Sequence, residues 1–156
     1  MKKSKQTGLD FEVDKLTNSI ENVITKDSFP TDITLISSTD LKTVTKKNGW
    51  QFDWKFELKQ PERDVYKLSI VNNQSVVQGL ISLEVKADHV YMHLVESAPF
   101  NKGKTKIYTG VPGNLVAFAC NFLFSGDMKE TFPSCQKHSS YNIILTHWEQ
   151  NISEAE

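Results

Sequence analysis

The chain has 156 residues, of which 38% are hydrophobic and 24% are charged, and this balance is that of a globular domain large enough to bury a core. Its 18 basic and 19 acidic residues give a formal net charge of -1, so global charge gives no reason to expect nucleic acid or an anionic membrane as a partner. The longest apolar run is too short to span a membrane, and the N-terminal lysines are not followed by the apolar segment of a secretory signal.

The chain holds two cysteines, Cys120 and Cys135, and neither has a Cys-x-x-Cys partner. Disulfides are rare in reducing compartments, so this usage predicts a reduced, cytoplasmic protein. The polar residues 1–8 are expected to form a flexible N-terminus. Residues 9–156 show no internal repeat and are predicted to form a single domain.

The N-terminal third of the chain gives short and mixed signals. Five elements are predicted there, in order a strand, a helix, a turn, a strand and a helix, over residues 11–16, 16–24, 28–32, 33–36 and 39–47. Apolar residues at helical spacing support the first helix, and Pro30 supports the turn. Ser38 or Thr39 is expected to cap the second helix.

The segment 50–58 alternates between apolar and polar residues, which is the period of a strand with one buried face. On a strand its apolar positions would share that face: Trp50, Phe52, Trp54, Phe56 and Leu58. The pattern therefore predicts a strand whose aromatic side chains enter the core.

Three further strands are predicted over 65–71, 76–85 and 90–95, with Gly79 as a candidate bulge. The turns between them are short and polar, which predicts an antiparallel meander. Together with the flanking helices, these strands predict an α/β (α+β) fold with a mixed, mainly antiparallel central sheet.

A helix is predicted to begin at Gly113 or Asn114 and to end before 125–127. Its apolar stripe follows helical spacing: Leu115, Phe118, Ala119, Phe122 and Leu123. A poor strand over 128–132 follows. A last helix, capped by Ser139 or Ser140, is predicted with an inner stripe of Ile143, Ile144, His147 and Trp148.

Two motifs that suggest other chemistry are rejected from their context. Residues 98–105 fit a relaxed phosphate-loop pattern, but Gly110 and Pro112 stop the helix that such a loop requires. His89 and His93 share a strand face, but no third ligand lies near them in sequence, so no metal site is predicted.

Glu96 stands where the strand pattern breaks before Pro99, and two interpretations stay open. It is either an ordinary carboxylate at a strand end or a general base whose pKa is raised by apolar walls. Lys102, Lys104 and Lys106 follow, and they either solvate a loop or neutralise a phosphate-rich ligand.

The Gly110-Val111-Pro112-Gly113-Asn114 segment lies between a strand and a helix. It is either a simple capping turn or a place where free N–H groups and the helix dipole attract phosphate. Its two glycines would also let a ligand approach the backbone closely.

The segment 94–118 resembles the GNAT superfamily of acetyl-CoA-dependent N-acyltransferases, and the meander before it fits the same order of strands. The resemblance implies a GNAT-like domain in which the helix N-terminus holds the pyrophosphate of coenzyme A. It also implies a set of residues that bind the pantetheine arm and the phosphates: Leu94, Val95, Lys106, Gly110, Val111, Gly113, Asn114 and Leu115. Pro112 replaces a glycine of the usual motif and has no N–H to donate.

The resemblance also assigns catalytic roles. Glu96 would accept a proton from the amine. The superfamily often has a tyrosine as the acid for the leaving thiolate; Trp148 takes the comparable place here, and Tyr141 or His147 is expected to substitute for it.

Two functions are therefore expected from the resemblance. The first is transfer of an acetyl group from acetyl-CoA to an unidentified small-molecule or protein amine. The alternative is a GNAT-fold binding or regulatory module without catalysis, in which an exposed sheet edge or apolar patch is covered by a second copy of the chain.

Overall fold

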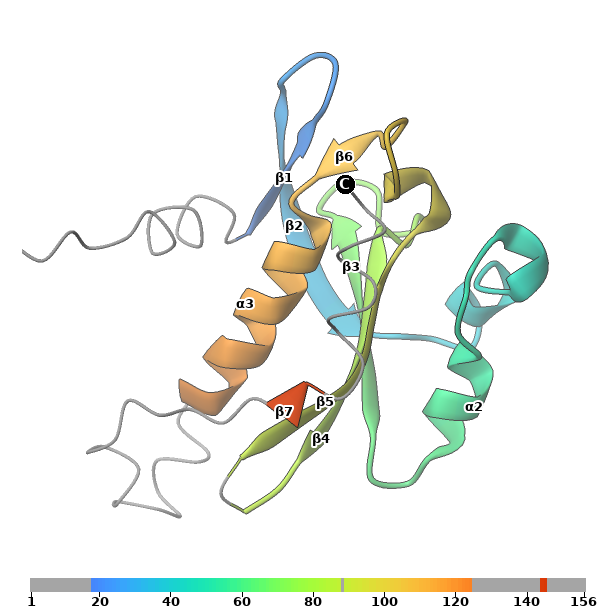
Figure 1. Cartoon of the computed structure of the whole chain (residues 1–156), viewed down its shortest axis with the longest axis vertical. Helices are drawn as coiled ribbons and strands as arrows, with labels where there is room; N and C mark the ends of the chain where they lie inside the picture. The colour runs from blue at the N-terminus through green and yellow to red at the C-terminus, as the bar shows by residue number, and fades with distance from the viewer. Residues whose placement is uncertain (1–17, 88, 125–143, 146–156) are drawn as a thin grey trace, which may run out of the picture.

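The computed structural model describes residues 18–87, 89–124 and 144–145. Within these residues a curled, mainly antiparallel sheet has the strand order β6-β1-β2-β3-β4-β5-β7 (Figure 1). The strands are β1 (Ser19–Asn22), β2 (Ser28–Leu35), β3 (Asp64–Ile70), β4 (Gly79–Val85), β5 (Val90–Ser97), β6 (Tyr108–Thr109) and β7 (Ile144–Leu145). All neighbouring strands are antiparallel except β5 and β7, which are parallel.

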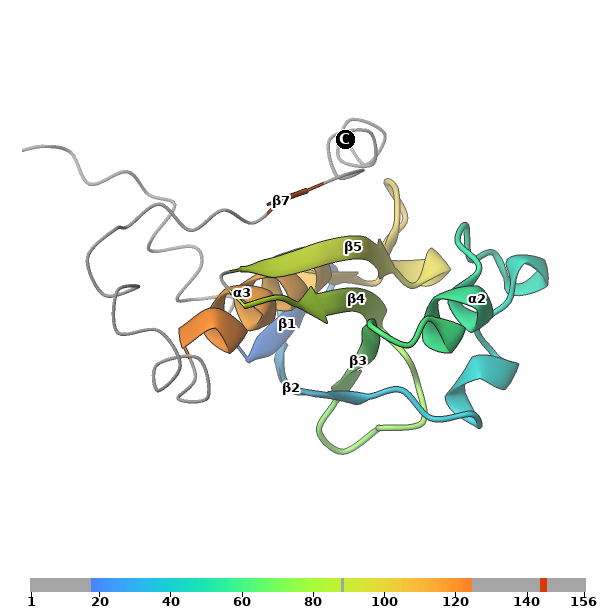
Figure 2. The same cartoon turned by 90° about the horizontal axis from the view of Figure 1, so that it is seen from below.

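The described residues form two α-helices, which lie on opposite faces of the sheet. Helix α3 (Val111–Phe124) lies on one side of β3, β4 and β5, and helix α2 (Trp54–Lys59) lies on the other (Figures 1 and 2). Three 3-10 turns, η1 (Asp40–Lys42), η2 (Lys46–Asn48) and η3 (Pro99–Asn101), complete the set. None of these described helices is long and apolar enough to cross a membrane.

Each face of the sheet has its own core. On the α3 side, Leu115 and Ala119 pack with apolar side chains of the sheet that include Leu68, Ile81 and Met92. On the α2 side, Trp50 and Trp54 pack with a second set that includes Val65, Leu80 and Ala98. The sheet is therefore covered on both faces, and the predicted mixed fold with flanking helices is confirmed at this level.

The predicted antiparallel meander is also confirmed, since β3, β4 and β5 pair in sequence order. The predicted bulge lies elsewhere. Gly79 is the first residue of β4, and the irregularity lies opposite Ser82 and Leu83, where His93 has no partner in the register. The single extra residue changes which side chains share a face. Val90 and Met92 before it belong to the α3-side core, whereas Leu94 after it packs on the α2 side.

The predicted strand over 50–58 is wrong. Asp53 caps helix α2 by accepting a 3.0 Å hydrogen bond from the Phe56 N–H. The helix buries Trp54, which is 1% exposed, and leaves Phe56 59% exposed, so the two aromatic residues do not share a buried face. A local cap and the 3.6-residue period override the alternating pattern.

The N-terminal predictions are also corrected. Residues 19–22 of the predicted helix 16–24 form β1, and residues 28–32 of the predicted turn begin β2. The turn lies between them, where the Asn22 side chain accepts hydrogen bonds from the N–H groups of Ile24 and Thr25. These short local bonds stabilise a hairpin in place of a helix.

Two other boundaries differ from the predictions. The short helix over 39–47 is replaced by η1 and η2, and Thr39 makes no side-chain cap at η1. Helix α3 begins at Val111, two residues before Gly113, because Gly110 adopts a φ of 94° and ends the preceding segment.

Several predictions concern the C-terminal and N-terminal parts of the chain. Ile144 lies in β7, which corrects its place in a last helix. The structure does not describe residues 1–17, 125–143 and 146–156. The predictions made for these segments therefore lie outside the described residues: the flexible 1–8, the strands 11–16 and 128–132, and the caps Ser139 and Ser140.

Candidate functional site

The end of strand β5 and the start of helix α3 meet across Gly79. Gly79 pairs with Ser97 at the end of β5, and its Cα faces the first turn of the helix. A Cβ at this position would lie 2.6 Å from Val111 Cγ1 and 3.0 Å from Leu115 Cδ1. The absence of a side chain at Gly79 therefore lets α3 approach β4 beside the end of β5.

The edge of β5 that faces away from β4 is paired only over the first residues of the strand. Strand β7 pairs with β5 at Tyr91 and Met92. Within the described residues, no strand pairs with residues 94–97 on the side away from β4. The backbone of Leu94 and Val95 lies in this open segment, directly after the bulge at His93, so an extended ligand has an edge to follow there.

The first turn of α3 is held by Asn114. Its side-chain amide donates 2.7 Å hydrogen bonds to the carbonyl oxygens of Ser19 and Gly110, and its backbone N–H donates to Gly110 at 3.0 Å. Leu115 and Val111 are buried. Gly113 is exposed, and no acceptor among the described residues contacts its N–H. Of the residues expected to bind phosphate through their N–H groups, Gly113 is therefore the exposed one.

Glu96 is buried on the α2 side of the sheet, with its side chain 2% exposed. Oε1 accepts hydrogen bonds from the Gln51 N–H at 2.7 Å and from Lys102 Nζ at 2.6 Å. Oε2 accepts from Trp54 Nε1 at 2.7 Å and from the Phe52 N–H at 3.4 Å. The carboxylate thus connects β5 to the segment before α2 and to the loop after η3.

This placement separates two parts of the predicted site. Glu96 lies opposite Leu80, whose side chain packs in the α2-side core, whereas Val111 packs in the α3-side core. Glu96 and the first turn of α3 therefore lie on different faces of the sheet. A substrate proton could reach Glu96 only if one of its protein donors moved away.

The three lysines before β6 have different surroundings. Lys102 pairs with Glu96, so its charge is already neutralised within the protein. Lys104 is exposed and Lys106 is half-buried. Lys106 precedes Ile107, whose backbone N–H donates to Phe100 at 2.9 Å and whose carbonyl accepts from Val23. The loop is thus fixed directly after Lys106.

Asn101 orders the connection between β5 and α3, and its role was not predicted. It is buried, and its amide donates to the backbone and side-chain oxygens of Gln78 at 3.1 and 2.9 Å. Its Oδ1 accepts from the Tyr108 N–H at 3.2 Å. An asparagine at the end of a Pro-initiated 3-10 turn is the only local sign of this role.

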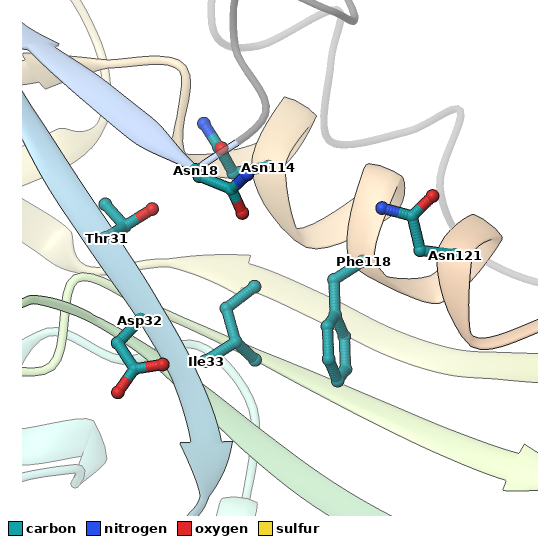
Figure 3. A pocket seen from close by; sticks show the side chains of 7 residues that line it. All are labelled: Asn18, Thr31, Asp32, Ile33, Asn114, Phe118 and Asn121. Carbon is teal, nitrogen blue, oxygen red and sulfur yellow. The ribbon is translucent and has the colours of Figure 1, made fainter. Parts of the chain in front are cut away.

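A cavity of about 240 Å³ lies between β2 and α3 (Figure 3). Its lining is mostly polar and comprises Asn18, Thr31, Asp32, Ile33, Asn114, Phe118 and Asn121. The sequence pattern did not predict it, because its residues come from three separate segments. It lies on the α3 side of the sheet, whereas Glu96 lies on the α2 side.

Tyr141 and His147 lie outside the described residues. Among the described residues, no group of three or more His, Cys, Asp or Glu is arranged to hold a metal ion. His93 pairs with Glu84, its Nε2 lying 2.6 Å from Glu84 Oε2.

Comparison of the chain with protein-family models, with curated proteins and with solved structures found no match.

Proposed function

We propose that this protein is a cytoplasmic GNAT-like N-acetyltransferase that binds acetyl-CoA along the open edge of β5 and transfers its acetyl group to an amine. The observation that carries the proposal is the geometry at Gly79. It brings residues 94–97 of β5, whose edge away from β4 pairs with no strand of the described residues, close to the start of α3. An extended pantetheine arm would follow the edge, and the pyrophosphate would lie at the helix N-terminus.

Among the expected cofactor-binding residues, Leu94 and Val95 would offer backbone groups to the pantetheine arm. Gly110, Val111 and Gly113 would form the turn at the pyrophosphate, with Asn114 and Leu115 anchoring that turn to the sheet. The half-buried Lys106 would add positive charge near the phosphates. The acceptor is a small-molecule or protein amine.

Calorimetry with coenzyme A and the full chain tests the binding step. Gly113→Glu introduces a negative charge where phosphate is expected, and we expect it to weaken binding about tenfold or more, because like charges repel. A glutamate in the first turn of a helix favours folding, so this variant retains its structure. Asn121→Glu places the same charge at another exposed position of α3 and should change binding less than twofold. Equal effects of both substitutions would contradict the proposed pyrophosphate position.

A second function is favoured by Glu96, whose two oxygens accept four hydrogen bonds from the protein. If no other group acts as base, the chain binds coenzyme A without catalysis and acts as a binding or regulatory module, as a monomer or as a homodimer. Mass spectrometry of a broad amine panel after incubation with acetyl-CoA separates the two functions. An acetylated amine that depends on the protein excludes the module without catalysis.

A further inference from the structure

Strands β4 and β5 hold a carboxylate–imidazole pair on the α2 side of the sheet. Glu84 Oε2 lies 2.6 Å from His93 Nε2, and Glu84 Oε1 pairs with the Lys86 ammonium. The His93 ring also packs on Tyr91, with ring centroids 4.4 Å apart. The side chains of Glu84 and His93 are 9% and 16% exposed, so the pair is sheltered and still reaches solvent at the imidazole.

The bulge is what brings this pair together. His93 is the extra residue of β5, opposite no residue of β4. Bulges redirect side chains and are frequent beside functional sites. Here the bulge directs the imidazole toward Glu84, and the next residues of β5 are Leu94 and Val95, which begin the open edge.

The charge of Glu84 determines which imidazole nitrogen of His93 carries the hydrogen that faces it. Hydrogen bonds from Lys86 and from His93 lower the pKa of Glu84 to about 2, so its carboxylate is ionised near neutral pH. An ionised carboxylate accepts hydrogen bonds, so the imidazole nitrogen that faces Glu84, Nε2, is the one that carries hydrogen. Nδ1 is then the nitrogen left to accept a proton, and no hydrogen bond to it is found among the described residues.

The other charged groups around the pair leave this arrangement intact. Lys86 balances Glu84, and Glu62 contacts Lys86 at 3.7 Å. Tyr91 adds its aromatic ring from β5. Two further carboxylates on this face are already occupied: Glu57 accepts hydrogen bonds from Arg63 and Ser82, and Glu96 accepts them from Gln51, Phe52, Trp54 and Lys102.

We propose that His93, oriented by Glu84, is the general base of acetyl transfer, an assignment that rests on the proposed function. The amine nitrogen attacks the thioester carbonyl, the C–N bond forms and the C–S bond breaks. The amine proton passes to His93 Nδ1 and from there to solvent. The coenzyme A thiolate leaves and takes its proton from water. Glu84 is a positioning residue that holds the tautomer.

The test compares His93→Gln and Glu84→Gln with the wild-type full chain, and uses His89→Gln as a matched histidine control. Acetyl transfer is measured as kcat/KM from pH 5.5 to 9.5, and coenzyme A affinity by calorimetry. We expect His93→Gln to lower kcat at least about 100-fold and to remove the acid limb of the pH profile. Its affinity for coenzyme A should change less than about threefold. Glu84→Gln should lower kcat about tenfold, and His89→Gln should behave as wild type.

Retention of the acid limb or of wild-type kcat in His93→Gln overturns the assignment. A wild-type chain that binds coenzyme A but acetylates no amine overturns the catalytic role of His93 and leaves cofactor binding in place. A chain that does not bind coenzyme A overturns the proposed function itself. Nitrogen-15 NMR of the imidazole gives a separate readout: hydrogen on Nε2 is expected in the wild type, and hydrogen on Nδ1 would contradict the proposed pair geometry.

Discussion

The indole Nε1 of Trp54 donates a 2.7 Å hydrogen bond to Oε2 of Glu96, and this bond joins helix α2 to strand β5. Glu96→Gln would turn an amide hydrogen toward groups that are themselves donors. Removing a buried charge from its partners is strongly destabilising, so we expect the free energy of unfolding to fall by about 3 kcal/mol. Urea denaturation followed by tryptophan fluorescence measures the change.

Lys102→Met is the matched control, because it removes one donor and leaves the other three in place. It should cost less than Glu96→Gln, about 1 kcal/mol, since Lys102 is partly exposed. A Glu96→Gln variant that unfolds at the wild-type urea concentration would contradict a structural role for this carboxylate.

Asp40 and Lys67 form a sheltered ion pair with Asp40 Oδ1 and Lys67 Nζ 2.8 Å apart. Burial alone would raise the pKa of Asp40, but hydrogen bonds from Lys67 and Ser37 outweigh it and lower the pKa below its ordinary value. The resulting stabilisation is present above the unfolded-state pKa, about 4, and is lost as the pH falls through the folded-state value.

We therefore expect Asp40→Asn to destabilise the protein by about 3 kcal/mol at pH 7, with a smaller difference from wild type below about pH 4. Asp27→Asn, at an exposed position of the β1–β2 turn, is the control and should show little effect at either pH. Urea midpoints measured from pH 7 to pH 3 test this. If the difference in stability between Asp40→Asn and wild type grew toward acid pH, the predicted direction of the pH dependence would be wrong.

Gly79→Ala tests the contact between β4 and the start of α3. The added Cβ would lie 2.6 Å from Val111 Cγ1 and 3.1 Å from the Glu96 carbonyl oxygen, so the helix must shift. Overpacking of this kind costs about 1–3 kcal/mol, and we expect coenzyme A affinity to fall as well.

Gly103→Ala is the control variant, because it replaces a glycine that has no contact with helix α3. Nothing lies within 4 Å of a Cβ there, but its φ of +71° disfavours alanine, so a loss of about 1 kcal/mol is expected without a change in coenzyme A affinity. If both variants bind coenzyme A equally, the start of α3 is not part of the site.

Asn114→Asp tests the attachment of α3 to β1. The replaced amide donates to the Ser19 and Gly110 carbonyls, and a carboxylate would face the same two oxygens without a hydrogen to donate. We expect the free energy of unfolding to fall by about 2 kcal/mol. Asn121→Asp on the exposed side of the helix should stay within about 0.5 kcal/mol of wild type. Equal urea midpoints for the two variants would exclude the anchoring role of Asn114.

The sequence predicted those parts of the fold that depend on local patterns. Strands β3, β4 and β5 follow from alternation and short polar turns, and the packing of Leu115, Phe118 and Ala119 of α3 follows from helical spacing. The segment 50–58 was wrongly predicted as a strand because its aromatic residues alternate with polar ones. In the structure Asp53 caps the N-terminus of a helix by accepting a hydrogen bond from the Phe56 N–H. A cap of one hydrogen bond is a weak signal beside five aromatic or apolar positions.

The candidate site was predictable only in part. The order of strand, loop and helix from Glu96 to Asn114 was predicted, and the structure confirms this order. The donors to Glu96 could not be predicted, because Trp54 and Gln51 lie 42 and 45 residues earlier in the chain. Nor could the bulge at His93, which shows no sign in the sequence and decides which side chains share a face.

The hydrogen bond between Asn114 and Ser19 joins residues 95 positions apart and sets an order of events during synthesis. Strand β1 can pair with β2 early, but its other edge waits for β6 and for the first turn of α3. Until those residues leave the ribosome, the growing chain presents an unpaired edge at which another strand can add. Contacts of such long sequence separation form late, so closure of this edge is expected to be among the slowest steps of folding.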